Sequence, residues 1–249
     1  MKNKKIQGFD LERSIIHTLL LKCSLLRDMG LFRGKTGLAI FFVHYYKFTN
    51  EVLYEDVAEE LIAEIEEGLY NNLPIAFESG LSGIGWGLDY LVRQGFVEGD
   101  CKEICEEIDC KIMQIDPRRI TDYSLSKGIG GILLYVLDHC KIVLEQCNEI
   151  PFDDCYLGDL YAACIDLRSL KDVSEETLCL ANTYIAFHLD KKPVPDGMWD
   201  ICKIVQGIAD VNERQFSDYP LGLHNGLAGI LFEKCCIKDQ RNHEGNLHY

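Results

Sequence analysis

The sequence predicts an all-α fold in which pairs of helices repeat along the chain and close into a ring, an α/α toroid. Three observations support this prediction: a glycine signature that recurs at nearly constant spacing, an apolar helical run after each copy, and an acidic amphipathic helix after the first run. No segment alternates apolar and polar residues for long enough to indicate a β-sheet.

The glycine signature reads GxxG. Its four copies occupy residues 34–37, 80–83, 128–131 and 226–229. The first glycines lie 46, 48 and 98 residues apart, and because 98 is twice 49, we expect a degenerate fifth copy near residues 177–181. A fixed period of this size indicates a repeat architecture.

The residues between the signatures predict one inner and one outer helix per repeat. After Gly37 and after Gly131 the chain is apolar on every side of a helix, which is typical of a buried helix. In residues 54–67 the apolar residues form one stripe and glutamates fill the rest, so this helix has one face in water. The predicted inner and outer pairs are 34–48 with 51–70, 81–94 with 100–114, 129–143 with 156–169, 173–190 with 197–210, and 227–236 with 10–27.

The last of these pairs would join the two ends of the chain. We therefore expect about five inner and five outer helices in one toroid domain over residues 1–249, with a helix start at each GxxG. Two-helix units of this kind bury a continuous core only when neighbours stack.

Composition excludes several classes of partner. The formal net charge of −15 disfavours nucleic acid, whose phosphates need clustered Lys and Arg. The basic N-terminus lacks the apolar segment of a signal peptide, and residues 15–26 are too few and too polar to span a bilayer.

We expect a cytoplasmic protein without membrane insertion, so the 12 cysteines are predicted as thiols, mostly buried, and not as disulfides. Cys101, Cys105 and Cys110 as a metal cluster is a weaker alternative, because no second ligand cluster completes it.

Three of the glycine segments resemble the lanthionine synthetase C-like family. They are 30–39 (GLFRGKTGLA), 80–84 (GLSGI) and 226–230 (GLAGI), and the segment 55–61 (EDVAEEL) resembles the family's first outer helix. In that family such motifs open the inner helices of an α/α toroid. Members commonly have seven inner helices, so the resemblance implies a shortened form.

The resemblance implies peptide modification. Family enzymes close thioether rings in ribosomally made peptides, as in lantibiotic biosynthesis, and a zinc ion activates the peptide thiol. The family's zinc ligands are a Cys in a WCxG motif and the Cys and His of a CHG motif. A His in an AHG motif and an Asp ahead of an earlier GxxG are proposed to transfer protons.

This chain departs from the family at most of those positions. CHG is replaced by His224-Asn225-Gly226, WCxG is best matched by Cys179 within 178–181, and AHG is replaced by Ser126-Lys127-Gly128. The Asp position falls near Ala76, with Glu78 two residues later. Glu78 and Lys127 are therefore the candidate catalytic residues.

Zinc is the cofactor that the resemblance leaves open, although the changes favour a protein without one. Cys179 and His224 remain as metal-ligand candidates, with Cys202 or Asp218 as a third. A catalytic zinc normally has three protein ligands and one open position.

The glycines allow two interpretations. Glycine permits a positive φ and the close approach of neighbouring helices. Alternatively, converging helix starts present free amides to an anion or a peptide carbonyl, which would make the signatures a ligand-binding rim. The rim glycines are Gly34, Gly37, Gly80, Gly83, Gly128, Gly131, Gly226 and Gly229.

Three functions follow from these observations. The favoured one is a non-catalytic or divergent peptide-binding accessory factor, whose partner is a peptide or a modification enzyme. The second is a divergent zinc-dependent thioether cyclase that uses Cys179 and His224. The third is a carbohydrate-active α/α toroid enzyme, whose acid and base would come from Glu78, Asp122 and Asp218.

Overall fold

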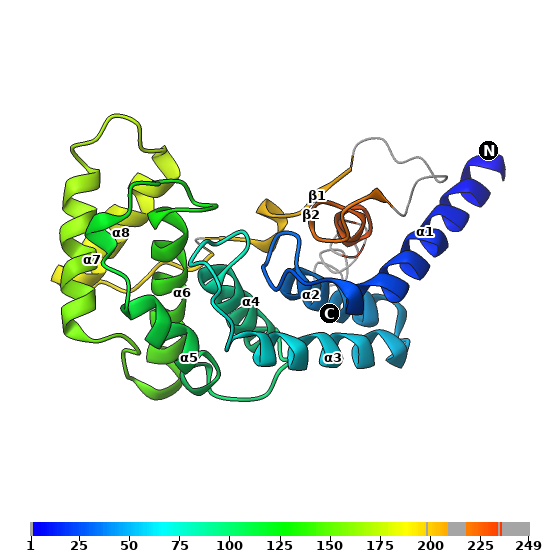
Figure 1. Ribbon diagram of the computed structural model, residues 1–249, viewed down its shortest axis with the longest axis horizontal. Coiled ribbons are helices and arrows are strands. Elements are labelled where there is room, and N and C mark those ends of the chain that lie inside the picture. Colours follow the sequence, from blue (N-terminus) through cyan, green and yellow to red (C-terminus); the bar gives the residue numbers. More distant parts are fainter. Residues whose placement is uncertain (1, 198, 209–217, 234, 236–249) are drawn as a thin grey trace, which may run out of the picture. The chain divides into compact units, whose positions relative to one another are not determined.

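The computed structural model describes residues 2–197, 199–208, 218–233 and 235 (Figure 1). This part of the chain is predominantly helical, which confirms the predicted all-α fold class. The chain divides into two compact units, namely Met1–Gly68 with Asp200–Tyr249 (unit 1) and Leu69–Trp199 (unit 2). None of the described helices has the length and apolar character that crossing a membrane requires.

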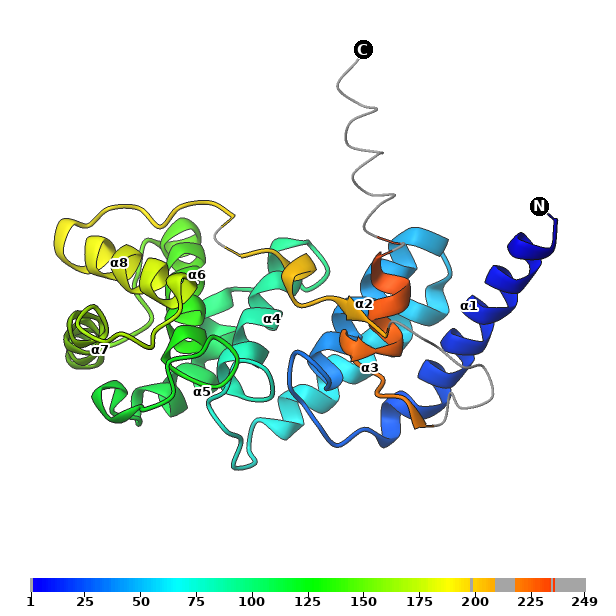
Figure 2. The same ribbon diagram turned by 90° about the horizontal axis from the view of Figure 1, so that it is seen from above.

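Unit 1 is built around the first predicted helix pair. Helices α2 and α3 pack side by side in both views (Figures 1 and 2). Every residue of α2 from Lys35 to Tyr45 is buried, whereas α3 buries one stripe, as an inner and an outer helix should. The elements of unit 1 are α1 (Lys2–Lys22), η1 (Cys23–Leu25), α2 (Lys35–Thr49), α3 (Val52–Gly68), η3 (Ile201–Lys203), β1 (Gln206–Gly207), β2 (His224–Gly226) and a helical segment at 227–233.

Unit 2 contains the next repeats. Helix α6 lies beside α4 and α8, α5 packs against α4 and α6, and α7 packs against α8 (Figures 1 and 2). The elements are α4 (Leu81–Arg93), α5 (Cys101–Met113), η2 (Pro117–Arg119), α6 (Ile129–Cys147), α7 (Asp154–Leu167) and α8 (Glu175–Asp190).

Two kinds of helix start occur. Helices α2, α4 and α6 begin directly after Gly34, Gly80 and Gly128, whose side-chain-free backbone is extended. The other helices of unit 2 begin at a side-chain cap that accepts a hydrogen bond from a first-turn amide. These caps are Asp100 for α5, Asp116 for η2, Asp153 for α7 and Ser174 for α8.

The structure corrects the predicted elements in four places. An outer helix was expected at 197–210, and this prediction is wrong for the described residues 199–208. They contain η3 and the strand β1, which pairs in parallel with β2. Pro193, Pro195 and Gly197 precede this segment and disfavour a helix there. Helix α8 buries a single stripe, so it is not an inner helix buried on all sides. The predicted partner of α7 was 129–143, but α7 packs mainly against α8.

The fourth correction concerns the N-terminal helix, which was expected at 10–27. It begins at Lys2 and ends at Lys22, and the tighter turn η1 follows. The helix expected at 227–236 is helical at the described residues 227–233, and residues 234 and 236 lie outside the description.

Candidate functional site

The four GxxG loops share one backbone turn. In each loop the residue after the first glycine donates its amide to a carbonyl seven residues earlier. These hydrogen bonds run from Lys35 to Asp28, from Leu81 to Pro74, from Ile129 to Asp122 and from Leu227 to Pro220, at 2.8–3.0 Å. Because the same turn recurs, the sequence repeat is also a structural repeat.

This turn explains the glycines. A Cβ on Gly80 would lie 1.9 Å from the Pro74 carbonyl oxygen, and one on Gly128 would lie 1.9 Å from that of Asp122. The second glycine of the third loop is constrained as well, since a Cβ on Gly131 would lie 2.4 Å from the Leu125 oxygen. The expected positive φ is wrong, because Gly80 and Gly128 have φ of −143° and −112°. Gly80 and Gly128 lie close to carbonyl groups of the loop that precedes each helix, whereas a close approach to a neighbouring helix was expected.

The amides expected to be free at the helix starts are already paired. In the second loop the amides of Leu81, Ser82 and Gly83 donate to Pro74, Ile75 and Gly80. The amides of Lys35 and Thr36 in the first loop are paired in the same way. The expectation of free amides is therefore wrong for these residues. The ligand-binding role of the eight rim glycines stays a prediction, and the structure gives the glycines a packing role.

Side chains at the helix starts of unit 2 form the candidate site. Glu78 and Lys127, the two candidate catalytic residues, come together: Lys127 Nζ lies 3.5 Å from Glu78 Oε1. The Glu78 amide donates to the Ser126 carbonyl at 2.8 Å and holds the two loops side by side. Both side chains are accessible, with 32% of Glu78 and 62% of Lys127 exposed.

An aromatic cluster borders this ion pair. The Trp199 ring packs edge-on against Phe77, the neighbour of Glu78, at 5.1 Å, and against Trp86 at 5.5 Å. Trp199 Nε1 donates to Glu176 Oε1 at the start of α8, at 3.1 Å. Trp199 was missed at the sequence level because it lies in a segment without periodicity.

A cavity of about 500 Å³ opens at the starts of α6 and α8. Hydrogen bonds from Ser124 lower the pKa of the Asp122 carboxyl in its wall. Thr177 Oγ1 donates to the Tyr123 carbonyl at 2.9 Å and ties the two helix starts together. The lining residues are Thr121, Asp122, Tyr123, Ser124, Asp172 and Ser174.

The predicted metal ligands lie in different units. Cys179 is exposed in the second turn of α8, whose start is fixed by the Ser174 cap. His224 and Cys202 belong to unit 1, where His224 Nδ1 lies 3.0 Å from the Ile204 carbonyl oxygen and Cys202 is exposed. Cys179 is thus inside a helix and not at a helix start, and Asn225 is a poor zinc ligand. These residues do not fit the family's zinc centre, and their joint metal site stays a prediction.

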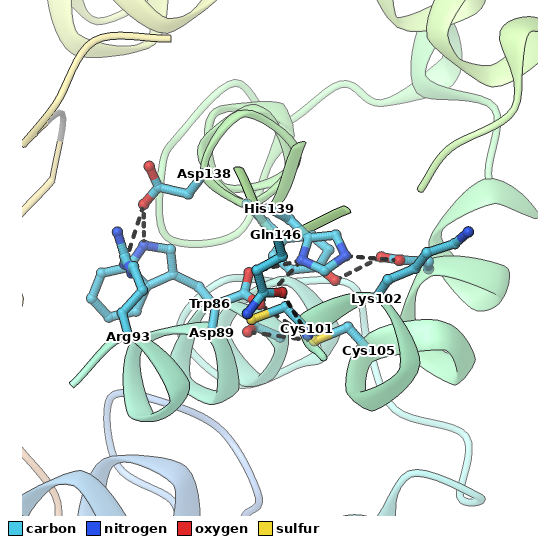
Figure 3. Close-up of polar contacts among 12 residues, drawn as sticks. Trp86, Asp89, Arg93, Cys101, Lys102, Cys105, Asp138, His139 and Gln146 are labelled. Carbon is cyan, nitrogen blue, oxygen red and sulfur yellow. Dashed lines mark hydrogen bonds and ion pairs between the residues drawn. The ribbon is translucent and has the colours of Figure 1, made fainter. Parts of the chain in front are cut away.

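A second cluster, not anticipated from the sequence, lies in the core of unit 2 (Figure 3). His139 of α6 joins Asp89 of α4 and Asp109 of α5: Nδ1 lies 2.9 Å from Asp89 Oδ2, and Nε2 lies 3.0 Å from Asp109 Oδ2. Tyr135 donates its hydroxyl to Asp109 Oδ1 at 2.6 Å, and Cys105 Sγ lies 3.8 Å from Asp89 Oδ1. All five side chains are buried.

The two carboxylates of this cluster stabilise the protonated form of His139. Burial alone would lower the pKa of His139, but hydrogen bonds and charge from Asp109 and Asp89 outweigh it and raise the pKa to about 10. Burial raises the pKa of Asp109, although the hydrogen bonds from His139 and Tyr135 lower it in part. His139 is therefore an imidazolium shared by two helices. Asp89 and His139 are ionisable residues inside otherwise apolar inner helices, and this was the sequence signal for the cluster.

A separate buried carboxylate lies one residue before His139. Asp138 Oδ2 accepts from Trp86 Nε1 at 2.7 Å, and Arg93 approaches the same oxygen at 3.9 Å (Figure 3). Burial raises the pKa of Asp138, and Arg93 and Trp86 oppose this effect. Asp138 therefore anchors α6 to α4 on the side of α4 that carries the aromatic cluster.

Comparison with known proteins gives one match. The family model described as lanthionine synthetase C-like protein matches residues 26–150, which are 125 of the 249 residues. No curated protein and no solved structure matches the chain. The matched region contains the first three glycine loops, the Glu78–Lys127 pair and the His139 cluster. Since the match extends over half of the chain, the protein belongs to the lanthionine synthetase C-like family.

Proposed function

We propose that this protein is a cytoplasmic, non-catalytic accessory factor that binds a peptide during the modification of ribosomally made peptides. The family acts on peptides in such modification. The observation that carries the proposal is the Glu78–Lys127 ion pair, in which Lys127 stands where the resemblance places a proton-transfer histidine and Glu78 lies two residues after the position of the proton-transfer aspartate.

Lysine changes what this position can do. An ammonium group has three donors and no acceptor, so it cannot take up a proton as a neutral imidazole does near neutral pH. Lys127 instead offers a fixed positive charge beside the carboxylate of Glu78. Such a pair suits the binding of a polar peptide backbone or its charged side chains.

The surroundings of the pair supply the other parts of a binding site. Ligand sites combine apolar and aromatic walls with a few placed polar groups. Half-buried Trp199 provides an aromatic wall, and the cavity beside Asp122 lies at the starts of the same row of helices. We infer that peptide side chains enter along this side of unit 2.

The test uses a synthetic peptide with one cysteine and one dehydrated threonine. The protein is expected to bind it, measured by calorimetry, without accelerating the loss of its free thiol. Lys127→Ala and Glu78→Ala should weaken binding by about 3- to 10-fold, as expected for accessible charged groups. Lys192→Ala is the matched control, because Lys192 forms an exposed ion pair with Asp190 at the end of α8.

Two outcomes would contradict the proposal. Zinc-dependent consumption of the thiol, lost in Cys179→Ala and His224→Ala, would establish the divergent cyclase. Absence of saturable binding by the folded protein would remove the peptide-binding function itself.

A further inference from the structure

Three metal-ligating atoms meet in the core of unit 2. One ligand atom each from Asp89, Cys105 and His139 lies within 4.8 Å of the other two. The separations to Asp89 Oδ1 are shorter, at 3.1 Å from His139 Nδ1 and 3.8 Å from Cys105 Sγ. Ligand atoms around a tetrahedral zinc ion are about 3–4 Å apart, so small side-chain shifts would complete the arrangement.

We propose that this cluster is a structural site for a zinc-type divalent ion, bound by Asp89, Cys105 and His139. The donors are a carboxylate oxygen, a thiolate sulfur and an imidazole nitrogen, which is the mixture that zinc prefers. A structural zinc takes a fourth protein ligand. We take Cys101 as this fourth ligand, because it is buried one helical turn before Cys105 and therefore on the same face of α5.

The residues behind His139 already hold its ring in the way that a metal-bound histidine is held. A metal-bound histidine usually donates its other ring N–H to a carboxylate, which fixes the ring and raises its basicity. Here Nε2 faces Asp109 at 3.0 Å, and Tyr135 holds the other Asp109 oxygen at 2.6 Å. Nδ1 therefore points toward Asp89 and the proposed ion.

The charges of the cluster accommodate the ion. Asp89, Asp109 and His139 are at most 4% exposed, so both carboxylates would act on the ion with little screening by water. With Cys101 as the fourth ligand, coordination replaces the proton on Nδ1 and the proton on each of the two thiols, so three protons leave for each ion bound.

An acidic cavity borders the cluster. It has a volume of about 510 Å³, and Asp109 forms part of its wall. Asp100, Glu103 and Glu106 line it as well, so its field attracts cations. The proposed site is distinct from Cys179 and His224, the positions that the family resemblance indicated.

The first experiment measures metal in wild-type protein purified without chelator, and then the spectrum after replacement by Co²⁺. We expect about one zinc per chain and a thiolate-to-cobalt charge-transfer band. The band should vanish in the double variant Cys101→Ser/Cys105→Ser. Cys164→Ser is the matched control, since Cys164 is also a buried thiol but has no carboxylate among the groups that shift its pKa.

A variant of Asp109, the carboxylate that faces His139 Nε2, gives an independent measurement. Asp109→Asn retains an acceptor oxygen and should weaken zinc affinity by about 10- to 100-fold in a chelator competition. A folded wild type with neither zinc nor the cobalt band would overturn the proposal and leave a metal-free ion cluster. Binding that survives the double cysteine variant but is lost in Cys179→Ala would also overturn it, and would place the metal at Cys179 on α8.

Discussion

At the scale of single residues, the nearest atom to a side chain on Gly80 or Gly128 is a carbonyl oxygen of the same loop. The oxygens of Pro74 and Asp122 occupy the space that a side chain on Gly80 or Gly128 would need. Because the clashing atom is backbone in both loops, it cannot rotate away as a flexible side chain could. The glycines are thus required by the turn, whatever the loop binds.

We predict that Gly80→Ala and Gly128→Ala each destabilise the protein by roughly 1–3 kcal/mol or more, as overpacked sites do. Gly158 is the control, because it lies inside α7 and a Cβ there meets nothing within 4 Å. Gly158→Ala should stabilise by about 0.5–1 kcal/mol through the higher helix propensity of alanine. Urea unfolding measures all three, and equal effects at Gly80 and Gly158 would contradict the carbonyl clash.

The cysteines should differ strongly in reactivity. Burial raises the pKa of Cys164 to about 12, so at about pH 8 only about one molecule in ten thousand holds it as the reactive thiolate. Cys179 is exposed on α8. We predict that iodoacetamide modifies Cys179 in the native protein well before Cys164, as read by peptide mass spectrometry. Equal rates in the native protein would contradict the prediction and show that the core opens on the labelling timescale. Rates that become equal only after the protein is unfolded in denaturant agree with the structure.

The sequence predicts which helices are buried but not which polar side chains meet in the core. Asp89, Asp109 and His139 come from three different helices and lie 20–50 residues apart along the chain. Periodicity shows which face of a helix is buried and carries no information on which buried groups meet across the interface. Lys127 was found because a family motif marked its position, and Glu78 because it lies two residues after another such position.

At the scale of elements, the His139 cluster connects α4, α5 and α6. A buried charge is costly unless each of its hydrogen-bonding positions is filled, and here Tyr135 fills one position on Asp109. The cluster therefore constrains how these helices pack in addition to the apolar contacts between them.

Removing one hydroxyl tests this role. Tyr135→Phe deletes a hydrogen bond to the Asp109 carboxylate and should cost about 1.5–3 kcal/mol of unfolding free energy. Tyr184→Phe deletes a bond of 2.9 Å from an equally buried hydroxyl to the neutral Leu157 carbonyl, and should cost about 0.5–1.5 kcal/mol. Chemical denaturation compares the two, and an equal or smaller loss at Tyr135 would show that Asp109 does not depend on this donor.

Helix starts were the elements that sequence reasoning predicted best. The three starts at Gly34, Gly80 and Gly128 lie within one residue of the prediction, because a glycine loop marks each one. The segment after α8 was wrong because the repeat period was extended across two prolines and Gly197, where local sequence opposes a helix. The repeat period predicts where the next helix pair should lie along the chain, but it does not establish that both helices of that pair form.

At the scale of the whole molecule, the single toroid domain stays a proposal. The family is a helical toroid, and the two units of this chain are each compact. The proposed pairing of α1 with the helix after Gly226 would bring the first and last repeats together. Both elements belong to unit 1.

Small-angle X-ray scattering tests the single domain. A compact domain of 249 residues should have a radius of gyration of about 18 Å. We expect this value for the monomer at low concentration. A clearly larger value with a flexible profile would contradict one closed domain and indicate two units that move independently.

The loop turn has a further consequence for how this scaffold tolerates change. In each GxxG turn the first amides of the helix donate to carbonyls of the loop that precedes them. Substitution at the accessible positions beside the glycines, such as 78 and 127, leaves that backbone network intact. The chemistry at the helix starts can therefore be lost, replaced or reinstalled by a few point mutations while the architecture persists, which makes this chain a ready host for redesigned peptide-binding and catalytic groups.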